Sequence, residues 1–393
     1  MTDMAERVVG LGLIGCGARL TGVIERVIEK TSGLRVVALC DPSEIAIAQC
    51  RERLDCPDAA LHEDHRALSA DPSVDWVCVG SWNCFHKEHI LGAFAAGKHV
   101  FTEKPLVTTM EDAVELKAAV EGTDRLFSMG FVLRYAPFYQ RIKALLDEGV
   151  IGQMVSFEFN ETLDFNHGGY IMSDWRRQRA NAGTHLLEKC SHDVDLMNWL
   201  TESVPVRVAS FGGLSFFTPE NAHQIERIGT DGEGREAYKS WQSMGIYTRV
   251  QKLNPFTAEK DIIDNQVGIL EYANGTRATF HTDLNTAMPE RRVYICGTEG
   301  TLRGDVLTGQ LEWRRIGFDT ELHKEETVGG GHGGADGILA DSLRESMLNG
   351  TAPLVGLEDG MKASVACFGL DAALDSGTVV DLRPMWAQVN VTP

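Results

Sequence analysis

Long apolar segments are missing from this chain of 393 residues. None approaches the roughly 20 residues that a membrane-spanning helix requires. Basic residues are also scarce, since 37 lysines and arginines stand against 56 aspartates and glutamates, for a formal net charge of −19. This charge opposes binding to nucleic acid or to an anionic membrane surface, so we expect neither as a partner. Residues 1–7 are polar, carry both charges and do not resemble a secretory signal.

Paired cysteine motifs are missing as well. The nine cysteines include no C-x-x-C pair, and several, such as Cys40 and Cys78, lie inside apolar segments. This usage is typical of reduced, buried thiols in a cytoplasmic protein. The remaining composition, 43% hydrophobic and 24% charged, is ordinary for a globular chain. The length favours two domains.

The first third of the chain alternates apolar segments with segments of helical periodicity. Strands are predicted at 8–16, 34–41, 75–81, 99–105 and 125–131. Helices are predicted between them at 18–30, 44–54, 86–97 and 110–122. Such alternation indicates a parallel sheet with right-handed crossovers.

After about residue 135 the pattern changes to alternating polar and apolar residues. Strands are predicted at 152–165, 206–217, 265–285, 291–306 and 309–316, with a hairpin signal at Asn274-Gly275. Helices are predicted at 138–148, 185–200, 336–348 and 357–376. The polar stretch 219–263 is interpreted as an insertion, either a surface loop or a lid. This half is therefore predicted to be an α+β domain with a large open, mostly antiparallel sheet.

A glycine turn follows the first predicted strand. Gly15-Cys16-Gly17-Ala18-Arg19-Leu20 fits G-x-G-x-x-G except at its last position, and Asp41 ends the second strand 24 residues after Gly17. Glycines there let a pyrophosphate approach a helix N-terminus, and the acid accepts hydrogen bonds from ribose hydroxyls. Because neither Pro42 nor Ser43 offers a cation for a 2′-phosphate, NAD is favoured over NADP. The predicted cofactor residues here are Gly15, Gly17, Ala18, Arg19, Leu20 and Asp41.

Lys104, in Glu103-Lys104-Pro105, lies at the carboxyl edge of the predicted sheet, where open α/β sheets bind ligands. From composition alone, a solvated lysine is the default interpretation. However, GAFAAGKHVFTEKP (92–105) and SWNCFHKEHI (81–90) resemble the signature of the Gfo/Idh/MocA family of sugar and cyclitol oxidoreductases. The resemblance implies that Lys104 approaches the reacting hydroxyl and the nicotinamide. It also extends the predicted cofactor site to Ser81, Trp82, Asn83, His86, Glu103 and Lys104.

Trp82 departs from the family, which usually has proline at this position. The indole could stack on the nicotinamide or the sugar, or could simply pack.

The segment AGTHLLEKCSHDVDLMNWL (182–200) resembles a second family segment, in which an acid precedes a histidine by one helical turn. Glu188 stands where the family usually has aspartate, and His192 matches its histidine. We predict that His192 is the general base, because its ordinary pKa of about 6.5 suits proton removal near neutrality. Glu188 is predicted to orient a neighbouring hydroxyl. A buried histidine paired with Asp193 or Asp195 is the structural alternative.

A rival interpretation of the same helix is a metal site. His185, Glu188 and His192 fall on one helical face, which could suit Zn²⁺. Because no H-E-x-x-H is present and the helix could begin after His185, we expect no metal.

Further substrate contacts are predicted outside this helix. Aromatic faces stack on sugar C–H surfaces and arginine offers a fork of donors. The glycine-rich segment 329–337 could present His332 and Asp336 to the site, or only connect two elements. Ordinary packing remains an alternative for each. The predicted substrate residues are Arg134, Tyr135, Tyr170, Trp175, Arg176 and His332.

The resemblance covers nearly the whole chain, with 219–263 matched least. It implies an α/β protein with a Rossmann dinucleotide-binding domain at 1–130 and a substrate-binding and oligomerisation domain at 131–393. The helix at 357–376 is expected to pack back on the first domain, and the protein to be a homodimer or homotetramer. The expected activity is NAD-dependent hydride transfer at a secondary hydroxyl of a sugar, sugar derivative or cyclitol. A glycosidase that oxidises its substrate transiently, a non-catalytic dinucleotide sensor and, remotely, a metal-dependent hydrolase remain alternatives.

Overall fold

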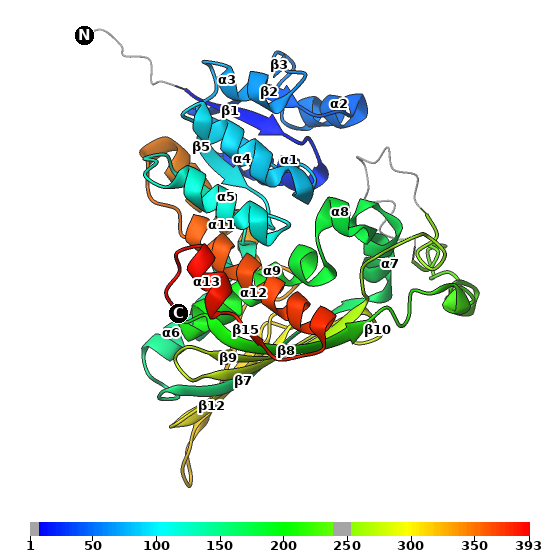
Figure 1. The fold of residues 1–393 in the computed structure, drawn as a ribbon, viewed down its shortest axis with the longest axis vertical. Helices are drawn as coiled ribbons and strands as arrows, with labels where there is room; N and C mark the ends of the chain where they lie inside the picture. Colours follow the sequence, from blue (N-terminus) through cyan, green and yellow to red (C-terminus); the bar gives the residue numbers. More distant parts are fainter. Residues whose placement is uncertain (1–7, 239–252) are drawn as a thin grey trace.

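The structure, a computed structural model, describes residues 8–238 and 253–393, which form two domains (Figure 1). The first domain is built on a parallel sheet with strand order β3-β2-β1-β4-β5-β6. Its strands are β1 (Val9–Ile14), β2 (Leu34–Cys40), β3 (Ala60–Leu61), β4 (Trp76–Val79), β5 (His99–Thr102) and β6 (Phe127–Met129). The intervening helices are α1 (Ala18–Ile28), α2 (Glu44–Arg53), α3 (His65–Ala70), η1 (Asn83–Phe85), α4 (His86–Ala95) and α5 (Met110–Val120).

The strand order reverses at β1, whose neighbours β2 and β4 continue in opposite directions along the sheet. At such a point the connections after the two strands diverge and leave room for a ligand at the carboxyl ends. Helices cover both faces of the sheet, which explains why β4 is buried at every residue. Side-chain caps start three of the helices: Ser43 caps α2, Asp64 caps α3 and Thr109 caps α5.

The second domain contains a nine-stranded sheet with order β14-β13-β12-β11-β7-β10-β9-β8-β15. The strands are β7 (Met154–Asp164), β8 (Pro205–Gly213), β9 (Asn265–Tyr272), β10 (Arg277–Thr286), β11 (Arg292–Gly297), β12 (Gly300–Asp305), β13 (Gln310–Arg315), β14 (Leu322–Glu326) and β15 (Val380–Asp381). Neighbours run antiparallel except β7 and β10, which pair in parallel. The predicted open, mostly antiparallel sheet is therefore confirmed.

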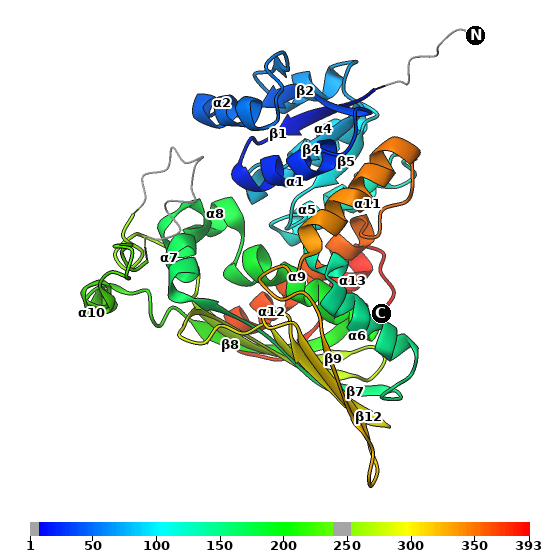
Figure 2. The same ribbon diagram turned by 180° about the vertical axis from the view of Figure 1, so that it is seen from behind.

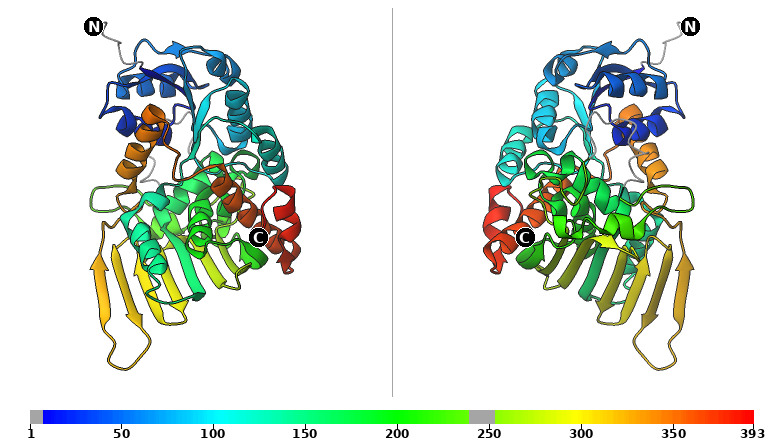
Figure 3. Two further views of the ribbon diagram at one scale, coloured as in Figure 1. Left: turned by 90° about the vertical axis from the view of Figure 1, so that its left-hand side faces the viewer. Right: turned by 90° about the vertical axis from the view of Figure 1, so that its right-hand side faces the viewer.

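Helices cover one face of this sheet and leave the other open (Figure 3). The covering helices include α6 (Pro137–Asp147), α9 (His185–Thr201) and α12 (Leu357–Ser376). On β9, buried residues alternate with exposed Val267 and Ile269, as expected for a sheet with one solvated face. α9 lies between the sheet and the first domain and is buried at almost every residue.

Both long tail helices contact the first domain, as expected for the helix at 357–376. α12 packs mainly on α9 and β8 and touches α5 and β6 less, so it belongs chiefly to the second domain. α11 (Ala335–Asn349) instead lies against α1 (Figure 2). There Arg344 donates from Nε to the Val27 carbonyl at 2.8 Å. α12 is rich in small apolar residues, which allow the close packing against α9.

Most predicted elements are present within a few residues, including the Asn274-Gly275 hairpin between β9 and β10. The prediction missed the short elements β3, α3, β14 and β15. It also missed η2 (Val132–Tyr135), α7 (Phe165–Ser173), η3 (Trp175–Arg177), α8 (Arg179–Ala182) and α13 (Arg383–Gln388). The expected insertion contains η4 (Pro219–Asn221) and α10 (Gln224–Ile228), and 239–252 of it lie outside the described residues. Among the described residues, no helix is both long and apolar enough to span a bilayer.

Candidate active site

The glycine turn joins β1 to α1 and is shaped by close backbone contacts. Gly15 has φ +88°, and a Cβ there would lie 2.6 Å from Gly80. Gly17 is the N-cap of α1, makes no side-chain cap, and would meet nothing within 4 Å if it carried a Cβ. The first intrahelical bond joins Thr21 N to Gly17 O, so the amides of residues 18–20 have no acceptor within the helix. These features fit a pyrophosphate at the helix N-terminus.

Leu20 occupies the position of the third glycine in the fingerprint. Its side chain is buried against the sheet, where a Cβ on Gly80 would lie 2.5 Å from the Leu20 Cβ. The close helix–strand approach is therefore made by Gly80, at the end of β4, instead of by a glycine on the helix. The Leu20 side chain is therefore not available to the cofactor.

Asp41 follows β2 and is fixed by two backbone amides. Its Oδ2 accepts from Cys16 N at 2.8 Å and its Oδ1 accepts from Ser43 N at 2.7 Å. An ionised carboxylate has about four acceptor positions, so further acceptor capacity remains for hydroxyl groups. The acid is thereby tied to the glycine turn at the sheet edge.

Side chains of the segment after β4 form hydrogen bonds to the backbone of neighbouring loops. His86 is buried, with Nδ1 2.7 Å from the Pro105 carbonyl and Nε2 3.1 Å from the Ser81 carbonyl. Asn83 donates from Nδ2 to the Ala182 carbonyl of the second domain at 2.9 Å. The predicted nicotinamide-side residues Asn83 and His86 therefore hold this edge in place through backbone contacts.

Lys104 reaches from the end of β5 to α9. Its Nζ donates to the Glu188 carbonyl and to Glu188 Oε1, the latter at 3.2 Å. Burial lowers the pKa of Lys104, and the Glu188 carboxylate opposes that shift. The first domain thus contributes an ammonium group to the helix that carries His192.

Glu188 accepts from two cations at one oxygen. Arg176 Nε lies 3.1 Å from the same Oε1 that Lys104 contacts. Burial alone would raise the pKa of Glu188, but Lys104 and Arg176 outweigh it and hold the pKa at about 2. The carboxylate is therefore ionised throughout the neutral range.

Arg176 joins Glu188 to an aromatic stack. Its Nη1 donates to Tyr170 Oη at 2.8 Å and to Asp174 Oδ2 at 2.7 Å. Its guanidinium carbon lies 4.4 Å from the centre of the Trp175 ring. Trp175 stacks on Trp82 of the first domain, with centroids 5.2 Å apart and planes at 11°. Trp82 remains 38% exposed, so one indole from each domain meets at this stack.

His192 lies one turn after Glu188 on α9 and is 7% exposed. Its Nδ1 is buried and has no hydrogen-bond partner among the described residues. Burial lowers the pKa of His192 well below its usual value, and the positive charges of Lys104 and Arg291 lower it further. The imidazole is therefore neutral at physiological pH.

The glycine-rich segment brings His332 beside His192, with ring centroids 6.5 Å apart. His332 Nδ1 lies 2.9 Å from Asp336 Oδ2, and Arg19 Nη1 donates to Asp336 Oδ1 at 2.5 Å. Arg19 Nε also donates to Glu103 Oε1 at 2.9 Å. Predicted residues of the glycine turn, the EKP segment and the glycine-rich loop are thus linked in one hydrogen-bonded network.

A buried charge network lies behind His192 and was not predicted. Arg291 pairs with both oxygens of Asp193 at 2.7 Å and with Glu161 Oε1 at 3.0 Å, and Lys189 donates to Glu161 at 2.7 Å. Two features of the chain point to this network. Glu161 lies in the buried C-terminal part of β7, and Arg291, directly before β11, is also buried.

Arg134 and Tyr135 were predicted to contact substrate. The Arg134 guanidinium is buried and makes a two-bond pair with Asp195 at 2.7 and 2.8 Å and a third bond to Asp359 at 2.9 Å. Tyr135 is 4% exposed. These bonds occupy Arg134 Nε and Nη2, and together with the burial of both side chains they favour packing at the domain junction, which was the stated alternative, for Arg134 and Tyr135.

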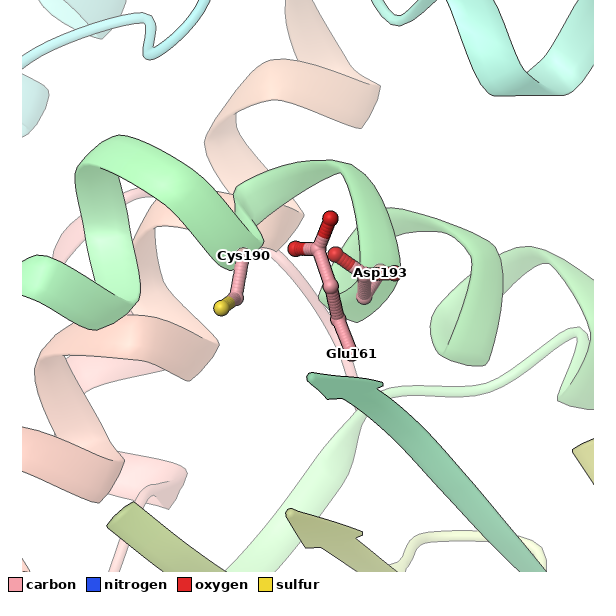
Figure 4. Close-up of side chains that lie close together, drawn as sticks. All are labelled: Glu161, Cys190 and Asp193. Carbon is pink, nitrogen blue, oxygen red and sulfur yellow. The ribbon is translucent and has the colours of Figure 1, made fainter. Parts of the chain in front are cut away.

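The structure does not bring together the ligands of the alternative metal site, because His185 and Glu188 face different partners. His185 Nε2 lies 3.1 Å from Thr282 Oγ1, toward the sheet, whereas Glu188 turns to Lys104. Among the described residues, the group with metal-ligand spacing is Glu161, Cys190 and Asp193, whose ligand atoms lie within 4.8 Å of one another (Figure 4). Both of its carboxylates already neutralise Arg291 and Lys189, so this cluster is a charge network and not a cation site.

Together, a Rossmann domain with an acid after β2 and a lysine–carboxylate–histidine group facing it define a dinucleotide-dependent oxidoreductase. Comparison with known proteins agrees. The model described as "Oxidoreductase family, NAD-binding Rossmann fold" matches residues 9–131, and the "GFO/IDH/MocA C-terminal domain" model matches residues 139–303. The chain belongs to the Gfo/Idh/MocA family of oxidoreductases, and its cofactor is NAD.

Similar proteins include a "Putative oxidoreductase YteT" of Bacillus subtilis, 25% identical over 81% of this chain and 83% of that protein. Inositol 2-dehydrogenase of Gluconacetobacter diazotrophicus is 40% identical, over 49% of this chain and 55% of that protein. The chain thus aligns with about half the length of this relative. A levoglucosan dehydrogenase, solved with NADH and L-sorbose, has the same fold with a TM-score of 0.77, 19% identity and coverage of 96% and 99% of the two chains.

Proposed function

We propose that this oxidoreductase transfers hydride between NAD and a secondary hydroxyl of a sugar, sugar derivative or cyclitol. The observation that carries the proposal is the contact of Lys104 Nζ with Glu188, one helical turn before His192. It brings a cation of the first domain and a neutral imidazole of the second domain to the carboxyl edge of the parallel sheet.

The residues at this edge fit NAD. The amides of residues 18–20 would meet the pyrophosphate, the Asp41 carboxylate would accept from ribose hydroxyls, and residues 81–83 would border the nicotinamide. When bound, NAD supplies the hydride acceptor at its nicotinamide ring.

The protein side chains then manage the proton and the charge. His192 Nε2 removes the hydroxyl proton, for which its lowered pKa keeps it neutral. Lys104 donates a hydrogen bond to the same oxygen and stabilises the negative charge that develops there. Glu188 holds Lys104 in place and accepts from a neighbouring hydroxyl.

The substrate class is supported by the surroundings of this centre. Tyr170, Trp175, Arg176 and His332 offer aromatic faces and donors, which suit a ring with several hydroxyls. The relative acting on inositol and the structural neighbour bound to a sugar support the same class.

We further propose a cytoplasmic homodimer or homotetramer that associates through the open sheet face. That face exposes Phe211, Val267, Ile269 and Tyr294. All nine cysteines are free, in keeping with a reducing compartment.

A panel of cyclitols, monosaccharides and glycosides tests the activity, with NAD⁺ and NADP⁺ in parallel and NADH absorbance as the readout. We expect NADH with at least one cyclitol or sugar and a preference for NAD⁺. Glycoside cleavage without NADH accumulation, or no turnover across the panel, would contradict the proposal.

A further inference from the structure

We propose that His332 receives the proton from His192 and passes it to solvent, so that the two histidines form a relay. This inference rests on the proposed function, in which His192 takes the hydroxyl proton. It assigns a specific task to a loop residue that the sequence indicated only as a substrate contact.

The spacing of the two rings suits transfer through one water. Their centroids lie 6.5 Å apart and their planes meet at 59°. A proton donor and acceptor can communicate directly or through a single bridging water. Because His192 Nδ1 is buried without a partner among the described residues, proton exchange with His332 must use Nε2.

The outer end of the relay is fixed and open to solvent. His332 Nδ1 lies 2.9 Å from Asp336 Oδ2, and Asp336 is held in turn by Arg19. A carboxylate on Nδ1 makes that nitrogen the N–H donor and leaves Nε2 as the acceptor. The His332 side chain is 38% exposed, whereas His192 is 7% exposed.

The other groups that face His192 are unsuited to receive a proton. Lys104 after β5, Arg291 before β11 and Lys189 on α9 are cations, and Phe131 presents a ring edge 5.7 Å away. The nearest acids on α9 are already paired: Glu188 with Lys104 and Arg176, and Asp193 with Arg291. His332 is the remaining imidazole that faces His192 among the described residues.

The step balances as a proton transfer. The N–H bond at His192 Nε2 breaks, an N–H bond forms at His332 Nε2, and the same proton then leaves for water. The Nδ1 proton of His332 stays on the hydrogen bond to Asp336. No electrons change hands in this step.

The test compares His332→Gln with wild type in the oxidation of myo-inositol, or of the best panel substrate, by NAD⁺. We expect kcat to fall on the order of tenfold with a smaller change in KM from the lost substrate contact, and added imidazole to restore much of the loss in kcat. His323→Gln is the matched control, because His323 stacks on Trp313 at the far strand β13. A rise in KM alone, or a loss of kcat that imidazole does not restore, would overturn the relay.

A second measurement does not need turnover. In histidine-labelled protein with NADH bound, NMR titration of His192 should move to higher pH in His332→Gln, because a proton held on His332 lowers the His192 pKa in the native site. An unchanged His192 titration would overturn the relay. Absence of turnover by wild type with the whole panel would instead contradict the proposed function. In that case the NMR titration alone would test the coupling of the two histidines.

Discussion

The two sides of the site are built in different ways. The part of the cofactor side that fits the pyrophosphate and the ribose uses backbone amides and one acid, which lie within a continuous stretch from Gly15 to Asp41. The substrate side combines charged and aromatic side chains from β5, β7, η3, α9 and the loop before α11. A local fold therefore suffices for the first, whereas the second exists only when distant segments meet.

The largest effect is expected at the base of the substrate side. Replacing His192 with alanine should lower kcat about a hundredfold to ten-thousandfold, because no other group takes the hydroxyl proton. NAD⁺ affinity, measured by calorimetry, should stay within about twofold of wild type. Wild-type turnover in this variant would remove His192 from the reaction.

The next effect falls on the cofactor side. Asp41→Ala should weaken NAD⁺ binding by about ten- to a hundredfold, since it removes ribose acceptors and the fixed partner of Cys16 N and Ser43 N. The quantity to compare is Kd by calorimetry, with Asp58→Ala, on the exposed surface, as control. If the two variants bind NAD⁺ alike, Asp41 is not part of the site.

Acid should destabilise the substrate side through its buried histidines. Burial lowers the pKa of His185 to about 4. The unfolded chain therefore binds more protons between that value and about 6.5, and stability falls as pH drops through this window. The loss attributable to His185 approaches about 3 kcal/mol below pH 4. His185→Gln should flatten the curve of unfolding free energy against pH by that order, and an unchanged slope would refute the assignment.

A smaller effect is expected at Gly80, which makes the close helix–strand approach that a glycine on the helix would otherwise make. Gly80→Ala should cost about 1–3 kcal/mol of stability, because its methyl group would meet Leu20 at 2.5 Å. Leu20→Ala in the same chain should recover part of the loss, since it removes most of the opposing side chain. Thermal melts of the four proteins give the coupling, and simple additivity would show that the two positions do not share a contact.

The smallest effect concerns the indole pair across the domains. Trp82→Ala should raise substrate KM a few-fold, equivalent to about 1 kcal/mol, with kcat nearly preserved. Phe85→Ala serves as the control, because Phe85 is an exposed neighbour of Trp82, whereas a tryptophan such as Trp386 is buried. Equal KM values in wild type and Trp82→Ala would place the stack outside substrate binding.

The same contrast explains what could be predicted from the sequence. Spacing and residue type were enough for the glycine turn and Asp41, because these depend on a contiguous strand–turn–helix–strand segment. Lys104 was predicted only from the family resemblance. The helix with Glu188 and His192 was also predicted, but the pairing of Glu188 with Arg176 was not. Arg291 and Glu161 are separated from α9 by many residues and meet it only through the sheet register. The ion pairs of Arg134 were not predicted, because the sequence gives no sign that Asp195 and Asp359 converge on it.

The central claim is that Lys104 and His192 act on one alcohol oxygen in one step. A double-mutant cycle of Lys104→Met and His192→Ala, read as kcat for NADH formation at saturating NAD⁺, tests it most directly. We predict that the double variant loses little more than the worse single variant, because groups that act as a unit are strongly non-additive. A double loss equal to the product of the two single losses would contradict the account.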